Sequence, residues 1–542
     1  MATFVAPVES QAASGQADRV THARERGFAL LLVTGLTLFA FAVHGYHPYA
    51  EDGGLYLAGV KRLLDPALYP KGAAFVLEPT RFSLFARLLA GLVRLSHLSL
   101  PIVLIALHLA SVWATLFAAW MLVARCWTER TPRAGAVVLL ACWLTLPVAG
   151  TALFLMDPYV TARSISTPCT LLALAGALSI TDWTGNERTQ WRGFVLCVAA
   201  IALAAVMHPL MAAYALWATL LLVCLRLQRH STRLWATVGL SGATLAGAAC
   251  LQLISKPESA DYLRIALTRS YWFPAMWAWY ELAGIAAPLA ILVTFAWTTR
   301  ATTRQDATRA QSAKRALARM AVAVGATASL VALLFARVGA ATHLMARIQP
   351  LRAFQIVYLV MVLTLGAKLG EYVLRRIAWR WVATIALLGG VMLAAQQAAF
   401  SASNHVEMPW MTPRNPWAQA FLWIRDNVPK DALFALDADY INARDTEAQA
   451  EDAQSFRAIA ERSALPDYSK DGGEASIAPD LTEAWTVGQA AQQGLSSPQE
   501  TDAQRIAALR PLGVSWVVLE TSATTSLDCP YQNAAVRVCR LR

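Results

Sequence analysis

Long apolar stretches with few charged residues constrain the fold of this sequence more than any other feature. About eleven such blocks lie between residues 28 and 400, and a run of about 18 or more apolar residues is long enough to cross a membrane as a helix. The composition agrees, because 57% of the residues are hydrophobic and 15% are charged, against roughly a quarter charged in soluble proteins. The sequence therefore predicts a polytopic α-helical membrane protein and excludes a soluble enzyme. The expected spans are 28–43, 101–123, 134–152, 164–181, 193–207, 209–226, 234–254, 280–298, 320–337, 351–368 and 381–400.

The positive charges are concentrated in four of the short connections between these blocks. The formal net charge is +11, but no basic stretch is interleaved with aromatic residues as in a nucleic-acid groove, so we expect no nucleic-acid partner. Basic residues instead mark the cytoplasmic loops of membrane proteins, which predicts a cytoplasmic N-terminus and an extracytoplasmic C-terminus. The connections contain Arg125, Arg130, Arg133, Arg226, Arg229, Arg233, Arg300, Arg304, Arg309, Lys314, Arg315, Arg319, Lys368, Arg375, Arg376 and Arg380.

Three regions are expected along the chain. Residues 1–26 are polar and predict a disordered cytoplasmic tail, and residues 27–400 form the transmembrane domain. Its first outer loop, 45–100, contains a segment at 81–98 with a charged stripe, which predicts a helix lying in the membrane interface. Residues 401–542 have a soluble composition in which expected helices alternate with strands near 431, 514 and 535, typical of a small α/β domain. Within that domain we expect the stretch 470–476 to be a loop.

Two cysteines near the C-terminus are candidates for a disulfide. Cys529 and Cys539 lie outside the apolar blocks, on the side that the topology places in an oxidising compartment. A closely spaced pair in such a compartment is expected to close a small loop.

Acidic residues in the expected outer loops are the candidates for chemistry. Glu51 and Asp52 follow the first span directly, with Tyr56 in the same loop, and the two glycines after Asp52 suggest a tight turn. Asp157 lies in the second outer loop. The plain alternative is that Glu51 and Asp52 are solvated charges with a helix-capping role, and that Asp157 caps the next helix or pairs with Arg163.

Basic residues and histidines also occur where the orientation rule does not need them. Arg264 and Arg269 lie in one outer loop, and His343, Arg347 and Arg352 lie near another. Arginine suits phosphate because its planar fork donates two parallel hydrogen bonds, so these residues suggest an anionic partner such as a lipid phosphate. His208 stands between two spans, where a structural role is the alternative to ligand binding.

Carboxylates and arginines on the outer side together suit one type of reaction. A carboxylate can remove a proton from an acceptor hydroxyl or hold a metal, and arginines can stabilise a departing phosphate. The combination predicts glycosyl transfer from a sugar carried on a lipid phosphate.

The layout resembles the GT-C superfamily of membrane glycosyltransferases, which includes protein O-mannosyltransferases and bacterial aminoarabinose transferases. The resemblance rests on the acidic pair Glu51–Asp52 after the first span, on Asp157 in the second outer loop, and on the start of the outer domain at 417–429 with the segments 456–463 and 470–474, which are similar to uncharacterised bacterial GT-C-like proteins. It implies a multi-pass protein of the bacterial inner membrane.

The resemblance also implies roles for individual residues. Asp52, with Glu51 beside it, would be the catalytic acidic residue, and Asp157 would assist; these two would also be the ligands of a divalent metal, if one is used. The basic groups that hold the lipid phosphate would correspond to Arg264, Arg269, Arg347 or Arg352. Beside the resemblance, His343, His208 and Tyr56 are further candidates for substrate binding.

The leading hypothesis is an inverting transferase that moves a sugar from a polyprenyl-phosphate donor to an extracytoplasmic acceptor, with membrane lipid as a further partner. One alternative is a transporter or flippase of a lipid-linked substrate, which predicts polar residues at mid-span. The spans contain almost none, and His108, the main exception, is expected to make an interhelical hydrogen bond. The other alternative is a non-catalytic scaffold that keeps the fold.

Overall fold

Long apolar helices make up most of the structure, a computed structural model that describes residues 9–182, 186–298, 305–440, 452 and 454–541. Within these ranges, nine helices are long and apolar enough to cross a membrane. Eight of these candidate spans lie within single helices: α1 (Glu9–His44), α5 (Leu100–Cys126), α7 (Ala162–Ile180), α8 (Glu187–Met207), α10 (His230–Ile254), α12 (Trp279–Thr298), α13 (Gln305–Phe335) and α16 (Ala378–Ala399). The ninth joins α14 (Leu344–Ile348), η4 (Pro350–Ala353), α15 (Phe354–Lys368) and the π-helical turn η5 (Leu369–Leu374).

The two remaining apolar blocks form shorter helices. α9 (Pro209–Leu225) has 17 residues, and α6 (Arg130–Cys142) has 13 where the sequence predicted a span over 134–152. After Cys142 the chain is irregular up to α7, with a bridge between Pro147 and Phe154. Much of this segment is buried in protein, which is the condition under which irregular backbone is tolerated at membrane depth.

The N-terminal segment differs from the prediction. α1 begins at Glu9, so residues 9–26 are helical rather than disordered, while residues 1–8 lie outside the described ranges. Residues of good helix propensity such as Ala, Gln, Arg and Glu follow one another here, and a helix that is already nucleated by an apolar span propagates through them at little cost.

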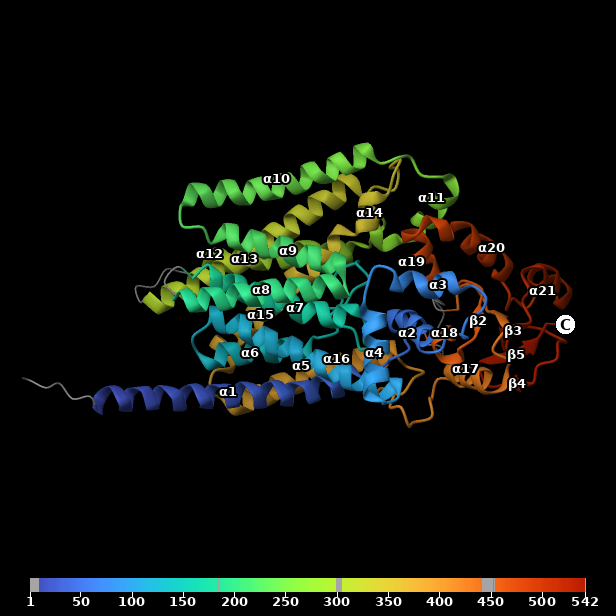
Figure 1. The fold of residues 1–542 in the computed structure, drawn as a ribbon, viewed down its shortest axis with the longest axis horizontal. Helices are drawn as coiled ribbons and strands as arrows, with labels where there is room; N and C mark the ends of the chain where they lie inside the picture. Colours follow the sequence, from blue (N-terminus) through green and yellow to red (C-terminus); the bar gives the residue numbers. More distant parts are fainter. Residues whose placement is uncertain (1–8, 183–185, 299–304, 441–451, 453, 542) are drawn as a thin grey trace, which may run out of the picture.

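The basic connections gather at one end of the bundle, away from the C-terminal domain (Figure 1). Arg226 donates to Ser312 Oγ at 2.6 Å, Arg309 lies 3.7 Å from Asp182, and Arg130 lies 3.6 Å from Glu25. We call this the basic end, and the opposite one the domain end. The predicted basic residues Arg300 and Arg304 lie outside the described residues.

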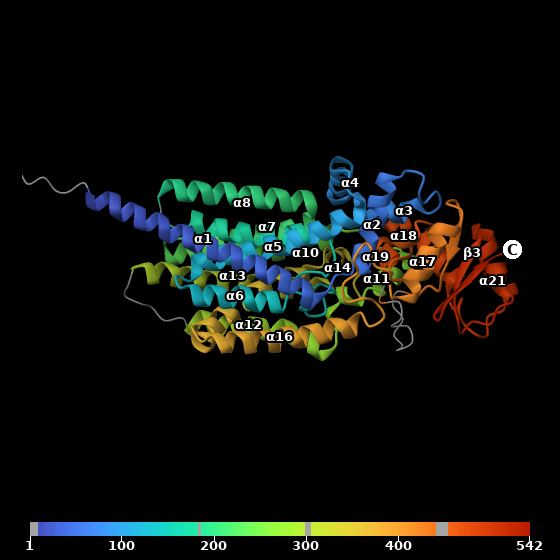
Figure 2. The ribbon, with the colours of Figure 1, turned by 90° about the horizontal axis from the view of Figure 1, so that it is seen from below.

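The first long loop lies at the domain end, between the bundle and the C-terminal domain (Figures 1 and 2). It contains α2 (Glu51–Leu64), α3 (Ala73–Leu77), η1 (Glu78–Thr80) and α4 (Phe85–Ser96). With 12 residues, α4 is too short to span. Leu88, Leu92 and Leu95 are exposed on it, so a helix is present over a shorter range than 81–98, and its position in the membrane interface stays a prediction. A second connection at this end holds α11 (Ala260–Leu267), η2 (Ser270–Trp272) and η3 (Pro274–Met276).

The C-terminal domain is a small mixed α/β domain, as its composition predicted. Its sheet has the order β2-β1-β3-β5-β4, in which β1 is parallel to β2 and β3, and β5 is antiparallel to β3 and β4. The structure forms the expected disulfide between Cys529 and Cys539. The strands are β1 (Leu433–Ala435), β2 (Ser463–Ala464), β3 (Trp516–Glu520), β4 (Tyr531–Gln532) and β5 (Val536–Arg540). The helices are α17 (Pro416–Asn427), α18 (Phe456–Ala460), α19 (Lys470–Ile477), η7 (Pro479–Leu481), α20 (Thr482–Gln492), α21 (Asp502–Leu509) and η8 (Arg510–Leu512).

The segment predicted as a loop at 470–476 is the helix α19, so that prediction was wrong. Its glycines suggested flexibility, but Gly472 serves close packing: a Cβ atom there would lie 2.8 Å from Arg269 Nη2 and 3.0 Å from Trp485 Nε1. Tertiary contacts therefore outweigh the low helix propensity of glycine.

The glycines after Asp52 also have a different role from the predicted turn. Gly53 and Gly54 are buried inside α2. A Cβ atom on Gly54 would lie 2.1 Å from Ser455 Cβ, so this glycine lets α2 pack directly on the C-terminal domain. Next to it, Ala50 bridges Gln454 in antiparallel fashion.

Replacing Gly54 with alanine is expected to loosen this contact. The added methyl group overpacks the interface, which typically costs about 1–3 kcal/mol, and lowers the midpoint of thermal unfolding of the purified protein in detergent. Gly91→Ala on α4 is the matched control, because a Cβ atom there meets nothing within 4 Å. Equal unfolding midpoints for the two variants would contradict the packing role of Gly54.

Candidate functional site

A single arginine joins the two predicted acidic residues at the domain end. Arg163 Nη2 lies 2.9 Å from Asp52 Oδ2 and 2.9 Å from Asp157 Oδ2, and Arg163 Nε donates to the same Asp157 oxygen at 3.2 Å. The Arg163 side chain is 6% exposed and that of Asp157 3%. Asp52 and Asp157 are therefore brought together through a buried guanidinium.

Local structure places each of the three groups. Asp52 lies in the first turn of α2, where its charge suits the helix dipole. Arg163 lies in the first turn of α7, whose N-terminus is closed by a capping box between Thr161 and Ser164. Thr161 Oγ1 also lies 3.3 Å from Asp157 Oδ2. Pairing with Arg163 was one alternative role predicted for Asp157, and the structure contains this ion pair. Arg163 binds Asp52 as well.

A lysine of the C-terminal domain closes the site from the other side. Lys470 Nζ lies 3.3 Å from Asp52 Oδ1 and also forms an ion pair with Glu51. Glu51 has a φ of 48°, which is rare for residues other than glycine. The acidic pair that follows the first span is therefore tied to α19, some four hundred residues further along the chain.

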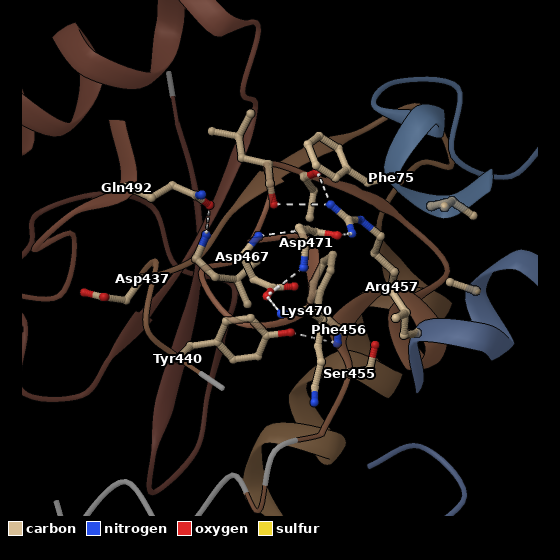
Figure 3. A pocket seen from close by; sticks show the side chains of 16 residues that line it. Phe75, Asp437, Tyr440, Ser455, Phe456, Arg457, Asp467, Lys470, Asp471 and Gln492 are labelled. Atoms are coloured by element: carbon tan, nitrogen blue, oxygen red, sulfur yellow. Dashed lines mark hydrogen bonds and ion pairs between the residues drawn. The ribbon is translucent and has the colours of Figure 1, made fainter. Parts of the chain in front are cut away.

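A buried network holds α19 in place beside a small cavity of about 20 Å³ with a mixed polar and apolar lining (Figure 3). Arg457 Nη1 donates to Asp471 Oδ1 at 2.6 Å, and the backbone N–H of Lys470 donates to Asp467 Oδ1 at 2.6 Å. Burial, together with the nearby charge of Asp471, raises the pKa of Asp467 to about 7. The cavity has room for about one water molecule, and its charged lining fixes the turn from which Lys470 projects.

Arg269, one of the predicted phosphate ligands, also supports this turn. It donates to the carbonyl oxygens of Ser469 at 2.6 Å and Tyr468 at 2.8 Å, and its guanidinium lies 5.2 Å from the centre of the Tyr468 ring. Because these bonds occupy the guanidinium, the structure places Arg269 as a residue that positions α19.

The two carboxylates beside Arg163 differ in their electrostatics. Burial alone would raise the pKa of Asp52, but the positive charges of Lys470 and Arg163 outweigh it and hold that pKa below its ordinary value. At Asp157 burial prevails and raises the pKa, in spite of Arg163. Asp52 is thus kept ionised, while Asp157 holds a proton more readily.

Glu474 is the carboxylate of this site without a partner. It lies one turn after Lys470 on α19, and its side chain makes no hydrogen bond or ion pair within the described part of the chain. Burial, with the charges of Asp471, Glu78 and Asp52, raises its pKa to about 8. Glu78 belongs to the same acidic group, and its buried Oε1 has no hydrogen-bond partner among the described residues.

Arg352 is a cation near Asp52 that has no carboxylate partner among the described residues. Among the described residues it forms no ion pair, and its buried Nε has no hydrogen-bond partner. Its charge is one of those that lower the pKa of Asp52. Arg352 lies in η4, directly before α15 and near the domain end of the ninth candidate span.

Two further predicted residues lie beside these groups. His208 Nδ1 accepts from the backbone N–H of Met211 at 3.4 Å, which gives the structural role that was the alternative. Burial, with the charges of Arg163 and Arg352, lowers the pKa of His208 to about 3, so it is neutral at physiological pH. Tyr56 lies one turn after Asp52 on α2, and burial raises its pKa to about 12.

Three other predicted ligands are engaged elsewhere. Arg264 forms an ion pair with Asp261, and its side chain is 73% exposed. Arg347 lies 3.1 Å from Glu258, whose other oxygen lies 2.8 Å from His343. These contacts hold the connection after α10 against α14, so the structure does not bring Arg264, His343 or Arg347 to Asp52.

The donor set does not fit a divalent metal. Within the described residues no three His, Cys, Asp or Glu side chains come together as metal ligands. Asp52 and Asp157 direct their Oδ2 atoms at Arg163 instead, so a guanidinium already supplies the positive charge between them.

Several residues of the site escaped sequence analysis. Lys470 and Glu474 lay in a presumed loop, and their spacing of four on a helix was the signal that could have found them. Arg352 was predicted as a substrate contact.

His108 was expected to make an interhelical hydrogen bond. Its buried Nδ1 lacks a hydrogen-bond partner in the described part of the chain, and the centre of its ring lies 5.1 Å from that of Tyr46.

Comparisons with known proteins give little support at the level of sequence. No protein-family model matches the chain, and no curated protein matches it. Among solved structures, the archaeal oligosaccharyltransferase AglB from Archaeoglobus fulgidus, in complex with an inhibitory peptide and a dolichol-phosphate, aligns with 92% of this chain and 70% of its own. The identity is 11% and the TM-score is 0.46. The functional argument therefore rests on the geometry of the site.

Removing Arg163 is expected to destabilise the protein strongly. Arg163→Met leaves the buried Asp157 and the half-buried Asp52 without their shared cation, a loss of about 3–5 kcal/mol. Adding Asp157→Asn to Arg163→Met should restore part of the lost stability, because one uncompensated charge disappears. The changes in unfolding free energy of the two single variants should therefore not add up to that of the double variant in thermal unfolding.

Arg264→Met is the control for this pair of substitutions. An exposed ion pair contributes about 0–1 kcal/mol, so the unfolding midpoint should stay close to that of the wild type. Simple additivity of Arg163→Met and Asp157→Asn would show that Arg163 does not couple the two carboxylates.

Proposed function

We propose that the protein is a membrane glycosyltransferase that moves a sugar from a polyprenyl-phosphate carrier to a hydroxyl acceptor at the domain end. The observation that carries the proposal is the grouping of an unpartnered Glu474 and an unpartnered Arg352 near an ionised Asp52, which the buried Arg163 holds. A buried carboxyl group and a guanidinium that both lack partners in one partly buried site are costly unless they serve a ligand.

Arg352 is the group proposed to hold the donor phosphate. Its place at the start of α15 puts a bound phosphate at the membrane surface, where a polyprenyl chain can stay in the hydrocarbon. A guanidinium can donate two parallel hydrogen bonds to phosphate. As the bond between sugar C1 and the phosphate oxygen breaks, negative charge grows on the phosphate, and Arg352 stabilises it.

Glu474 is the group proposed to accept the proton. The acceptor oxygen attacks C1 on the face opposite the phosphate, so its O–H proton has to leave as the new bond forms, and the configuration at C1 inverts. A carboxylate with a pKa of about 8 accepts a proton far better than the strongly ionised Asp52. Asp52, held by Arg163 and Lys470, then orients the acceptor hydroxyl by accepting a hydrogen bond.

The alternatives find less support in the same features. A non-catalytic scaffold gives no reason for three carboxylates to share one site with Arg163 and Arg352. A transporter needs charged partners along a path through the spans, whereas these groups gather at one end. The side of the membrane belongs to the proposal too: the positive-inside rule puts the basic end in the cytoplasm, so transfer takes place outside it.

Binding of farnesyl phosphate to the purified protein tests the donor site. Farnesyl phosphate should bind about 10- to 100-fold more tightly than farnesol, as expected for hydrogen bonds to a charged group, and Arg352→Gln should remove this difference. Arg264→Gln is the matched control and should keep it. Equal affinity of the wild type for the alcohol and the phosphate would contradict the proposal.

Turnover tests the chemistry separately. With a panel of farnesyl-phosphate-linked hexoses and a cell-envelope extract as the source of acceptor, Asp52→Asn should slow release of farnesyl phosphate by about 100-fold or more. Full activity of Asp52→Asn would refute its role. Binding of farnesyl phosphate without turnover of any hexose in the panel would favour the scaffold.

A further inference from the structure

A second cavity lies at the basic end, on the far side of the bundle from Asp52. It is an open groove of about 620 Å³ between α1, α5 and α6, a volume in the range of small-molecule sites. Its lining changes character along its length. Charged residues, among them Arg26, Arg125 and Arg133, lie at the end of the bundle, and apolar residues such as Leu30, Phe117 and Trp120 lie deeper along the helices.

We call this cavity the basic groove, because the positive charges of its arginines are not balanced by acidic partners among the described residues. Arg26 and Arg125 are exposed, and neither makes a side-chain hydrogen bond or ion pair within the described part of the chain. Arg133 donates from Nε to the carbonyl oxygen of Trp127 at 2.6 Å. The acidic residue of the lining, Glu25, lies 3.6 Å from Arg130 outside the groove. The groove therefore attracts an anion.

The deeper wall suits an alkyl chain. Leu30, four residues after Arg26 on α1, is exposed, and Phe117 and Trp120 lie on α5 about two turns and about one turn before Arg125, respectively. Both helices are long and apolar enough to span a membrane, so this wall faces hydrocarbon. An occupant needs an anionic head at the arginines and an apolar tail beside the aromatic rings.

We propose that the basic groove binds an anionic phospholipid of the leaflet at the basic end. Its phosphate would lie between Arg26, Arg125 and Arg133, and one acyl chain would follow Leu30 and Phe117. Basic pockets between transmembrane helices bind anionic lipid headgroups in this way, and arginine forks match phosphate oxygens. The groove is separate from the proposed active site, so this inference stands without the proposed function.

Native mass spectrometry of the full-length protein in detergent tests the proposal. Phosphatidylglycerol should bind more tightly than phosphatidylcholine with the same acyl chains. The double variant Arg26→Gln/Arg125→Gln should lose about 10- to 30-fold in affinity for phosphatidylglycerol, as expected for two basic residues at a membrane surface.

The control carries the same charge change at the same end of the bundle. Arg229→Gln/Arg233→Gln changes the residue directly before α10 and a residue in the first turn of α10, both outside the groove, and should bind phosphatidylglycerol like the wild type. Equal losses of affinity in both double variants would show that only the overall positive charge matters, and would contradict a specific site. Equal binding of the two lipids would also contradict the proposal, as would full competition by glycerol phosphate, which has no acyl chain.

Discussion

The shared guanidinium of Arg163 is the interaction on which the rest of the site depends. A buried arginine between Asp52 and Asp157 is stable only while both carboxylates stay in reach, so it fixes the start of α2 relative to the start of α7. The first long loop is thereby fastened to the bundle. The positive charge between the two carboxylates comes from a guanidinium of the protein, so these carboxylates are not arranged as the ligands of a metal.

The C-terminal domain completes this centre. Arg457 binds Asp471 in the first turn of α19, and Arg269 binds the turn before that helix. Together they direct Lys470 at Asp52 and leave Glu474 one turn further along. Gly54 allows the close approach of α2 and Ser455 on which this alignment rests. The domain therefore does more than cover the membrane bundle, because it supplies a cation and the carboxylate with the pKa best suited to accept a proton.

Sequence patterns predicted the parts of this structure that depend on local physics. Apolar length located the helices, and composition separated the C-terminal α/β domain. Asp52 and Asp157 stood out because acidic residues next to a membrane span need an explanation. The patterns failed where long-range contacts decide: α19 is helical because Asp467 and Arg457 secure its start, α6 ends early because the following segment is buried in protein, and Arg264 and Arg347 find acidic partners that sequence spacing does not reveal.

The most direct test of the account is the pH dependence of kcat/KM for transfer from a farnesyl-phosphate-linked hexose. A proton acceptor acts in its ionised form, and burial raises the pKa of Glu474 to about 8, so kcat/KM should rise with pH through a midpoint near pH 8. Glu474→Gln should lose this rise together with about 100-fold in rate, while Glu483→Gln, an exposed glutamate on α20, should keep both. A rise that persists in Glu474→Gln, or a flat wild-type profile across this range, would contradict the claim that the C-terminal domain supplies the proton acceptor.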